Sequence, residues 1–136
     1  MIKDLLNLHI IVGYAFLLIF LLTGVYLLIS FPDLYAGREE VRMMYRSNHI
    51  YLLMAALINI LYGHLFTIDT GSTAIKSLKA ISGGIVALAP IDLLGEFIVE
   101  PPQYLVERPI TFWGILALIV GVVFTSLLAL VARLRP

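Results

Sequence analysis

Four long apolar runs, separated by short polar segments, are the feature that most restricts how this chain folds. A helix that crosses the hydrocarbon core of a bilayer needs about 20 mostly apolar residues, and each run is long enough. The runs predict helices over residues 5–30, 43–67, 74–99 and 109–133. Because a bilayer core offers no water to backbone groups, a helix that satisfies its own hydrogen bonds suits such runs. The sequence therefore predicts an all-α integral membrane protein.

The overall composition agrees with this fold class. Hydrophobic residues make up 61% of the 136 residues and charged residues 13%, and this charged share is about half that of a typical soluble domain. A small soluble domain buries only about two thirds of its unfolded surface, so it could not hide this much apolar area. The net charge is zero, so we expect no nucleic-acid partner. The absence of cysteine excludes disulfides, thiolate metal sites and covalently attached haem.

Turn-forming and helix-breaking residues mark the ends of the predicted helices. Pro32 follows the first helix, and the turn sequence of residues 69–72 follows the second. Pro101 and Pro102 mark the predicted end of the third helix, because proline does not continue a helix easily. Pro109 stands at the start of the fourth, where its fixed backbone angle is favourable. Each predicted connection is therefore short.

Short connections predict an up-down-up-down bundle in which residues 1–136 form one domain. This topology places both termini and the second connection on one face. The basic residues predicted on that face are Lys3, Lys76, Lys79, Arg133 and Arg135, against Arg38, Arg42, Arg46 and Arg108 on the opposite face. Because cytoplasmic segments carry an excess of Lys and Arg, we expect both termini to be cytoplasmic, in an inner or plasma membrane.

Two histidines are candidate cofactor ligands. His9 and His64 lie about one turn from the ends of the first and second predicted helices, at comparable depth if these helices are antiparallel. Two imidazoles at one depth on neighbouring helices are the minimum for a bis-histidine b-type haem. Gly13 and Gly63 would leave room for the macrocycle. The alternative is that both histidines are interfacial side chains that bind no cofactor.

The residues around these histidines resemble a known family. Leu8-His9-Ile10-Ile11-Val12-Gly13, continued by Thr23-Gly24-Val25-Tyr26-Leu27, is similar to the first helix of small four-helix membrane cytochromes b. His49 and His64, with fourteen residues between them, resemble the paired ligands on one helix of di-haem cytochromes b. The resemblance implies haem b on His9 and His64 and electron transfer with a quinone or a redox partner. The chain departs from the di-haem pattern, because it has three histidines where four axial ligands are needed.

A second polar group is predicted at the opposite end of the bundle. Arg46 and His49 share a face of the second helix, and Asp92 and Glu96 share a face of the third. One interpretation is an ion-pair clasp between the two helices. Another is a quinone or proton site with His49 as proton donor or acceptor. The third is a metal site of His49, Asp92 and Glu96, because imidazole and carboxylate together suit iron, manganese or zinc.

Two further patterns concern the third and fourth helices. Ser82-Gly83-Gly84 and Pro90 predict an irregular third helix, and broken helices line the binding sites of some transporters. Ala117, Gly121 and Thr125 form a stripe of small residues on the fourth helix. Such a stripe allows another helix to approach closely, within the monomer or in a second copy.

Three functions follow from these patterns. The first is a small membrane b-haem protein in electron transfer, with quinone as a candidate redox partner, acting as a membrane oxidoreductase or as its electron-transfer subunit. The second is a cofactor-free accessory or assembly subunit of a larger membrane complex. The third is a small transporter or proton-path protein. In each case the expected partners are the lipid bilayer and other membrane subunits or a second copy.

Overall fold

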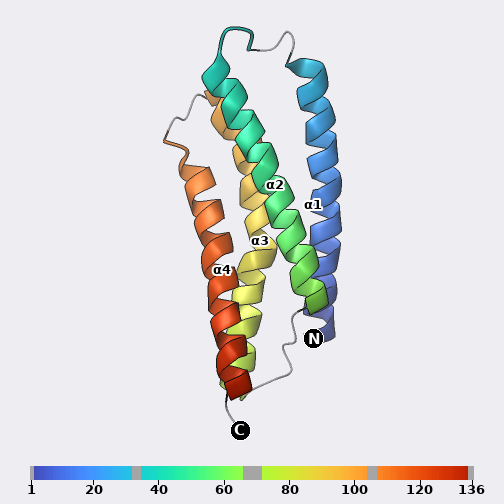
Figure 1. Cartoon of the computed structure of the whole chain (residues 1–136), viewed down its shortest axis with the longest axis vertical. Coiled ribbons are helices and arrows are strands. Elements are labelled where there is room, and N and C mark those ends of the chain that lie inside the picture. Colours follow the sequence, from blue (N-terminus) through green and yellow to red (C-terminus); the bar gives the residue numbers. More distant parts are fainter. Residues whose placement is uncertain (1, 32–34, 66–71, 104–106, 135–136) are drawn as a thin grey trace.

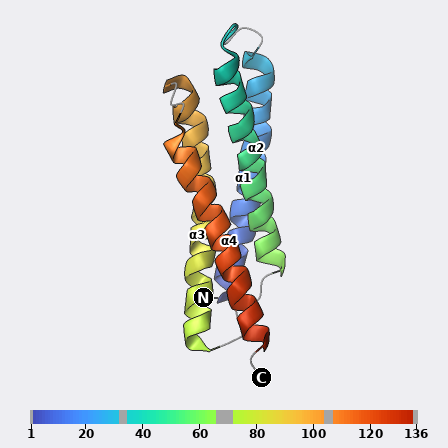
Figure 2. The ribbon, with the colours of Figure 1, turned by 60° about the vertical axis from the view of Figure 1, so that its left-hand side comes forward.

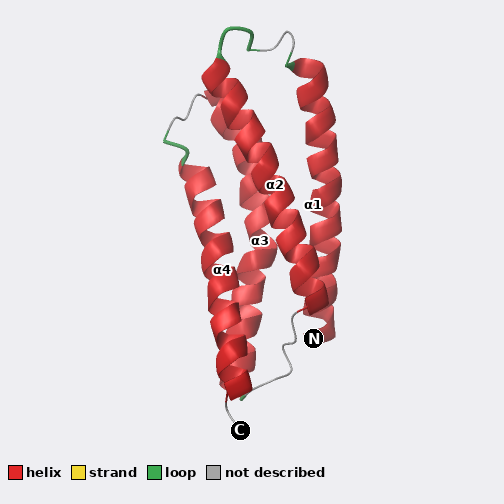
Figure 3. Cartoon of the chain, viewed as in Figure 1, coloured by secondary structure: helices red, strands yellow, loops and turns green. Residues whose placement is uncertain are grey.

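The structure, a computed structural model, describes residues 2–31, 35–65, 72–103 and 107–134. The helices are α1 (Ile2–Ser30), α2 (Glu39–Leu65), α3 (Thr73–Gln103) and α4 (Pro109–Leu134) (Figure 3). All four helices are long and apolar enough to cross a membrane. The prediction of an all-helical chain with four such helices is confirmed.

The helices form a bundle in which α2 and α3 are central. α1 packs along α2, α4 packs along α3, and contacts between α2 and α3 join the two pairs (Figure 1). Within the described residues, no Cα atom of α1 lies within 8 Å of a Cα atom of α4. α1 begins and α4 ends at one end of the molecule, seen in both views (Figures 1 and 2). We call this the terminal end, and the opposite end, where α1 ends and α2 begins, the loop end.

Two helix boundaries differ from the prediction. α2 begins at Glu39, four residues earlier than predicted, with Glu39 and Glu40 in its first turn. Carboxylates there interact favourably with the positive end of the helix dipole. α3 continues through Pro101 and Pro102 to Gln103, so the predicted end before these prolines is wrong. At the end of a helix, prolines remove only the last few backbone donors, and the helix tolerates the loss.

Other boundaries agree with the prediction or lie outside the described residues. α1 ends at Ser30 and α4 begins at Pro109, both as predicted. Most of the turn predicted over residues 69–72 lies outside the described part of the chain, as does the predicted end of the second helix at residue 67. α3 is continuous through Pro90, so the irregularity predicted for the third helix is not observed.

Close contacts through glycine hold the helix pairs together. A Cβ atom at Gly13 of α1 would lie 2.6 Å from Ile60 Cγ1 and 2.8 Å from Ile60 N of α2. A Cβ atom at Gly121 of α4 would lie 2.6 Å from Val86 Cγ2 of α3. Thr125, in the same stripe as Gly121, is fully buried. The small-residue stripe of α4 therefore packs against α3 within the monomer.

The core and the surface are both largely apolar. Leu52, Leu93 and Leu118, from three different helices, are at most 1% exposed. The outer faces of α1 and α4 carry many exposed large hydrophobic side chains, among them Ile11, Leu18, Leu22, Leu28, Trp113, Val120 and Leu127. Soluble monomers rarely expose apolar surface of this extent. The outer surface is thus compatible with a membrane location.

Candidate functional site

His9 lies inside the bundle near the terminal end. Its side chain is fully buried, and its Nδ1 is 2.7 Å from Oδ1 of Asn59 on α2. The imidazole packs against the Tyr62 ring, with 4.3 Å between the ring centroids. A Cβ atom at Gly83 of α3 would lie 3.2 Å from His9 Nε2. Nε2 has no hydrogen-bond partner among the described residues.

The residues that contact His9 make further hydrogen bonds, and together these contacts connect all four helices. Asn59 Nδ2 donates to the backbone oxygen of Val86 on α3 at 3.1 Å. The Tyr62 hydroxyl donates to Thr125 Oγ1 on α4 at 2.8 Å, and Thr125 Oγ1 is 2.6 Å from Ser82 Oγ on α3. We call these residues, with His9, the terminal-end network. Its polar groups are used to join helices.

His64, the second predicted haem ligand, points elsewhere. It is exposed in the last turn of α2, whereas Tyr62 is buried. Two residues along a helix correspond to about 200° of rotation, so these side chains leave opposite faces of α2. Gly63 is half-buried, and Gly13 packs against α2. The structure does not bring His9 and His64 together, and this arrangement does not fit a haem held between them.

The structure does not bring the four residues predicted to share a layer at the loop end together as one group. Arg46 is exposed and pairs with Glu39 of its own helix, with 3.3 Å between Nη1 and Oε1. Asp92 is exposed, and Glu96 is fully buried with no hydrogen bond to any described residue. The predicted clasp of Arg46 with Asp92 or Glu96 is therefore wrong. No group of three or more metal-binding side chains occurs within the described residues, which contradicts the metal site predicted from His49, Asp92 and Glu96.

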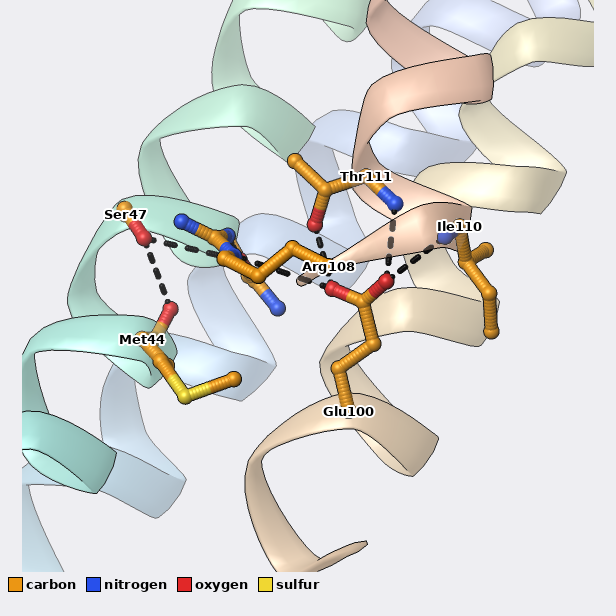
Figure 4. Close-up of polar contacts among 7 residues, drawn as sticks. Met44, Ser47, Glu100, Arg108, Ile110 and Thr111 are labelled. Carbon is orange, nitrogen blue, oxygen red and sulfur yellow. Dashed lines mark hydrogen bonds and ion pairs between the residues drawn. The ribbon is translucent and has the colours of Figure 1, made fainter. Parts of the chain in front are cut away.

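A different arginine reaches a buried carboxylate at this end (Figure 4). Glu100 of α3 is fully buried and accepts hydrogen bonds from the backbone N–H groups of Ile110, at 2.7 Å, and Thr111, at 3.0 Å, in the first turn of α4. It also accepts from the Thr111 hydroxyl. Arg108 Nε lies 3.7 Å from Glu100 Oε2, and its Nη2 donates to Asn48 Oδ1 on α2. These contacts join α2, α3 and α4. No local sequence pattern predicted them, because Glu100 contacts residues of another helix, 10 and 11 positions further along the chain, and Asn48 lies 60 residues from Arg108.

A groove of about 450 Å³ lies between α1 and α2 at the loop end. We call it the α1–α2 groove. Its lining residues are Gly24, Leu27 and Leu28 of α1, Phe31 directly after α1, and Arg42, Arg46 and His49 of α2. Two of the predicted site residues, Arg46 and His49, therefore line the groove, whereas Asp92 and Glu96 do not.

Contacts with α1 fix the orientation of His49. Its Nδ1 is 3.0 Å from Thr23 Oγ1, and its ring stacks on Phe20 with 4.1 Å between centroids. A Cβ atom at Gly24 would lie 3.2 Å from His49 Cε1, so glycine leaves room for the imidazole. His49 is thereby held half-buried in the wall of the groove.

Arg42 and Arg46 stand together at the mouth of the groove. Their Cζ atoms lie 5.4 and 5.9 Å from the centroid of the Phe31 ring. Both pair with the exposed carboxylate of Glu39, Arg42 at 3.6 Å and Arg46 at 3.3 Å. Arg42 was not among the predicted site residues. The signal for it was present, because Arg42, Arg46 and His49 have i, i+4, i+7 spacing and therefore share one helix face.

Comparison of this chain with protein-family models, with curated proteins and with solved structures found no match. The resemblance of α1 and α2 to membrane cytochromes b therefore stays a prediction from sequence. Function has to be inferred from the geometry of the α1–α2 groove and of the buried polar contacts.

Proposed function

We propose that this protein spans a lipid bilayer as an up-down-up-down bundle and binds an amphiphilic ligand in the α1–α2 groove. The observation that supports this most is the make-up of the groove, which has cationic side chains at one end and an apolar floor. Arg42 and Arg46 lie near the start of α2, at the loop end, whereas Gly24 and Leu27 lie further along the bundle. A molecule lying in the groove would meet charge at one end and hydrocarbon at the other.

The surface beside the groove suits the apolar part of such a ligand. Leu28 is 79% exposed and lines the groove, and the next residues along this side of α1, Val25 and Leu21, are also exposed. A chain that leaves the groove would therefore continue over apolar side chains. Ligand sites of this kind combine an apolar wall with a few placed polar groups.

The role we propose is that of an accessory subunit in an inner or plasma membrane, with both termini cytoplasmic. The terminal-end network and the Glu100–Arg108 contacts support this role, because they use the buried polar groups to hold helices together. The α1–α2 groove is then a part of the described surface that is equipped to bind a ligand. Partner membrane subunits would contact the bundle through its apolar outer faces.

Filling the groove tests the proposal. Gly24→Leu would place a side chain against His49 and on the groove floor. The protein, reconstituted in bilayers of defined lipids and released into detergent, is examined by native mass spectrometry for bound amphiphile. We expect bound amphiphile on the wild type and a loss in Gly24→Leu. Gly84→Leu is the matched control, because a Cβ at Gly84 meets nothing within 4 Å.

A second variant separates groove filling from damage to the fold. Leu28→Trp adds bulk at an exposed position on the rim, where little packing is disturbed. It should also reduce the amount of bound amphiphile. Equal retention by the wild type, Gly24→Leu and Leu28→Trp would contradict the proposed function.

The b-haem function remains a second candidate, with His9 as an axial ligand and without His64 as its partner, because of one feature of His9. Its Nδ1 is held by Asn59, which leaves the buried Nε2 unpartnered among the described residues. Histidine ligands of metals are commonly oriented in this way through their other nitrogen. Haem b would supply one-electron transfer, and the reduced-minus-oxidised visible spectrum of the purified protein tests for it. A b-type spectrum that is lost in His9→Ala would support this candidate, and a featureless spectrum would remove it.

A further inference from the structure

We propose that the ligand of the α1–α2 groove is an anionic phospholipid, with its phosphate bound by Arg42 and Arg46. This inference rests on the proposed function, because it names the ligand class of the same groove. It follows from the excess of positive charge at the groove mouth and from the position of that charge above an apolar floor.

The positive charge at the mouth is concentrated and only partly neutralised. Both guanidinium groups lie within 6 Å of the centroid of one ring, that of Phe31. Among the described residues, both pair with one carboxylate, that of Glu39, whose side chain is 61% exposed. Ion pairs with such exposed groups contribute little stability. An anion entering the groove would therefore face two cations and, within the described part of the chain, one easily displaced competitor.

The donor groups at the mouth suit a phosphate. Arginine offers five N–H donors in a planar fork that matches the oxygens of a phosphate. The ion pairs to Glu39 use Nη1 of each arginine. Nε of Arg42 makes no hydrogen bond to any described residue but is itself buried, so a phosphate would be bound through the outer N–H groups of the two guanidiniums. A phosphate ester with two free oxygens could accept from both side chains.

The rest of the groove suits an acyl chain more than a second polar group. Below the arginines, the α1 side of the groove consists of Gly24, Leu27 and Leu28. A neutral quinone would also fit an apolar floor, but it would not compensate two guanidinium charges. A water-soluble phosphate would compensate the charges and leave the floor unused. A phospholipid with a net negative head group satisfies both parts of the groove.

Competition between lipids that share the same acyl chains tests this assignment. The wild type is equilibrated with dioleoyl phosphatidylglycerol, dioleoyl phosphatidylcholine and ubiquinone in equal amounts, and the bound species are counted by native mass spectrometry. We expect phosphatidylglycerol to be retained at least about tenfold over phosphatidylcholine, because charge-assisted hydrogen bonds typically contribute this much or more. Inorganic phosphate in millimolar excess should not displace it.

Charge variants make the test specific to the two arginines. Arg42→Gln with Arg46→Gln should reduce the ratio of bound phosphatidylglycerol to phosphatidylcholine to nearly one, whereas Lys76→Gln, on α3 at the terminal end, should leave this ratio unchanged.

Glu39→Gln removes the competing carboxylate from an exposed site, so it should increase the preference for phosphatidylglycerol without affecting the fold. Arg42→Lys with Arg46→Lys keeps the charge but loses the fork, and should give an intermediate value.

The outcomes separate this inference from the proposed function. Equal retention of phosphatidylglycerol and phosphatidylcholine in the groove would overturn the inference and leave amphiphile binding intact. Preferred retention of ubiquinone, or displacement by inorganic phosphate, would also overturn it. A preference unchanged in both Glu39→Gln and the double Gln variant would show that the arginines do not select the ligand. Retention of no amphiphile at all would refute the proposed function itself.

Discussion

Asn59 is the residue on which the terminal-end network depends most. Its Oδ1 contacts His9 Nδ1, and its Nδ2 donates to the backbone oxygens of Ala55 and Val86. Asn59→Leu would leave His9 buried without a partner, and a buried unsatisfied polar group costs roughly 1–3 kcal/mol. We expect a loss of stability of that size in detergent-mediated unfolding. Adding His9→Phe should recover part of it, and strictly additive losses would show that the two residues are not coupled.

Replacing Glu96 is expected to affect stability in the opposite direction to replacing Asn59. Its carboxyl is fully buried and has no hydrogen bond within 3.5 Å to any described residue, and the neighbouring Thr111 hydroxyl donates to Glu100 instead. Replacing such a group with an apolar side chain of similar size is often neutral or stabilising. Glu96→Met should therefore leave the unfolding midpoint unchanged or raise it, and the exposed Asp92→Asn serves as a control. A marked loss of stability in Glu96→Met alone would mean that the carboxyl has a stabilising partner.

α2 shows which properties of single residues could be predicted from the sequence and which could not. Depth in the bundle followed from the sequence, because position along a helix sets it directly. Which neighbour each face meets did not follow, because it depends on the contacts of Gly13 and Gly24 with α2. These contacts turn the side of α2 that carries Arg46 toward α1 and away from α3. For the same reason, the position of His64 along α2 did not show that its side chain lies on the exposed face of this helix.

Gly13 controls the spacing of α1 and α2 at the scale of helices. A methyl group there would lie 2.8 Å from the backbone nitrogen of Ile60, and backbone cannot move aside as a side chain can. We expect Gly13→Ala to destabilise the bundle by roughly 1–3 kcal/mol through overpacking. Gly84→Ala, in open space, should be neutral or slightly stabilising. Equal thermal stability of the two variants in detergent would contradict the close packing of α1 and α2.

Glu100 is expected to fix the beginning of α4. It accepts the backbone N–H groups of Ile110 and Thr111, which have no acceptor within α4 itself. Loss of a helix cap costs roughly 0.5–2 kcal/mol, so Glu100→Ala should accelerate hydrogen exchange of these amides by roughly 2- to 30-fold. Amides around Leu118 should be unaffected, as should all of α4 in the exposed control Glu107→Ala. Unchanged exchange at Ile110 and Thr111 would remove the capping role.

The positions of the helices were largely predictable from the sequence, but some of the helix ends were predictable and others were not. Length and hydropathy identify each apolar run, because few other structures accommodate such runs. The start at Pro109 followed from a local rule. The persistence of α3 through Pro101 and Pro102 did not, because it accompanies the anchoring of Glu100 to α4, a contact between residues that no local pattern connects.

At the scale of the whole molecule, one stretch of the surface is expected to hold lipid more firmly than the rest. The chain has no cysteine, so a fluorophore can be placed at single introduced cysteines. Val25 lies on α1 beside the groove without lining it and is 52% exposed, and Leu127 lies on α4 outside the groove and is 54% exposed. In a bilayer both positions would be in contact with lipid. Only Val25 would keep that contact when loosely bound lipid is removed.

Quenching by brominated phosphatidylglycerol measures this difference most directly. Each labelled variant is reconstituted in bilayers that contain the brominated lipid, and its fluorescence is recorded before and after transfer to lipid-free detergent. We expect quenching at both positions in the bilayer, and after transfer quenching that persists at Val25 and disappears at Leu127. Equal loss of quenching at Val25 and Leu127 on transfer would contradict an amphiphile held in the α1–α2 groove.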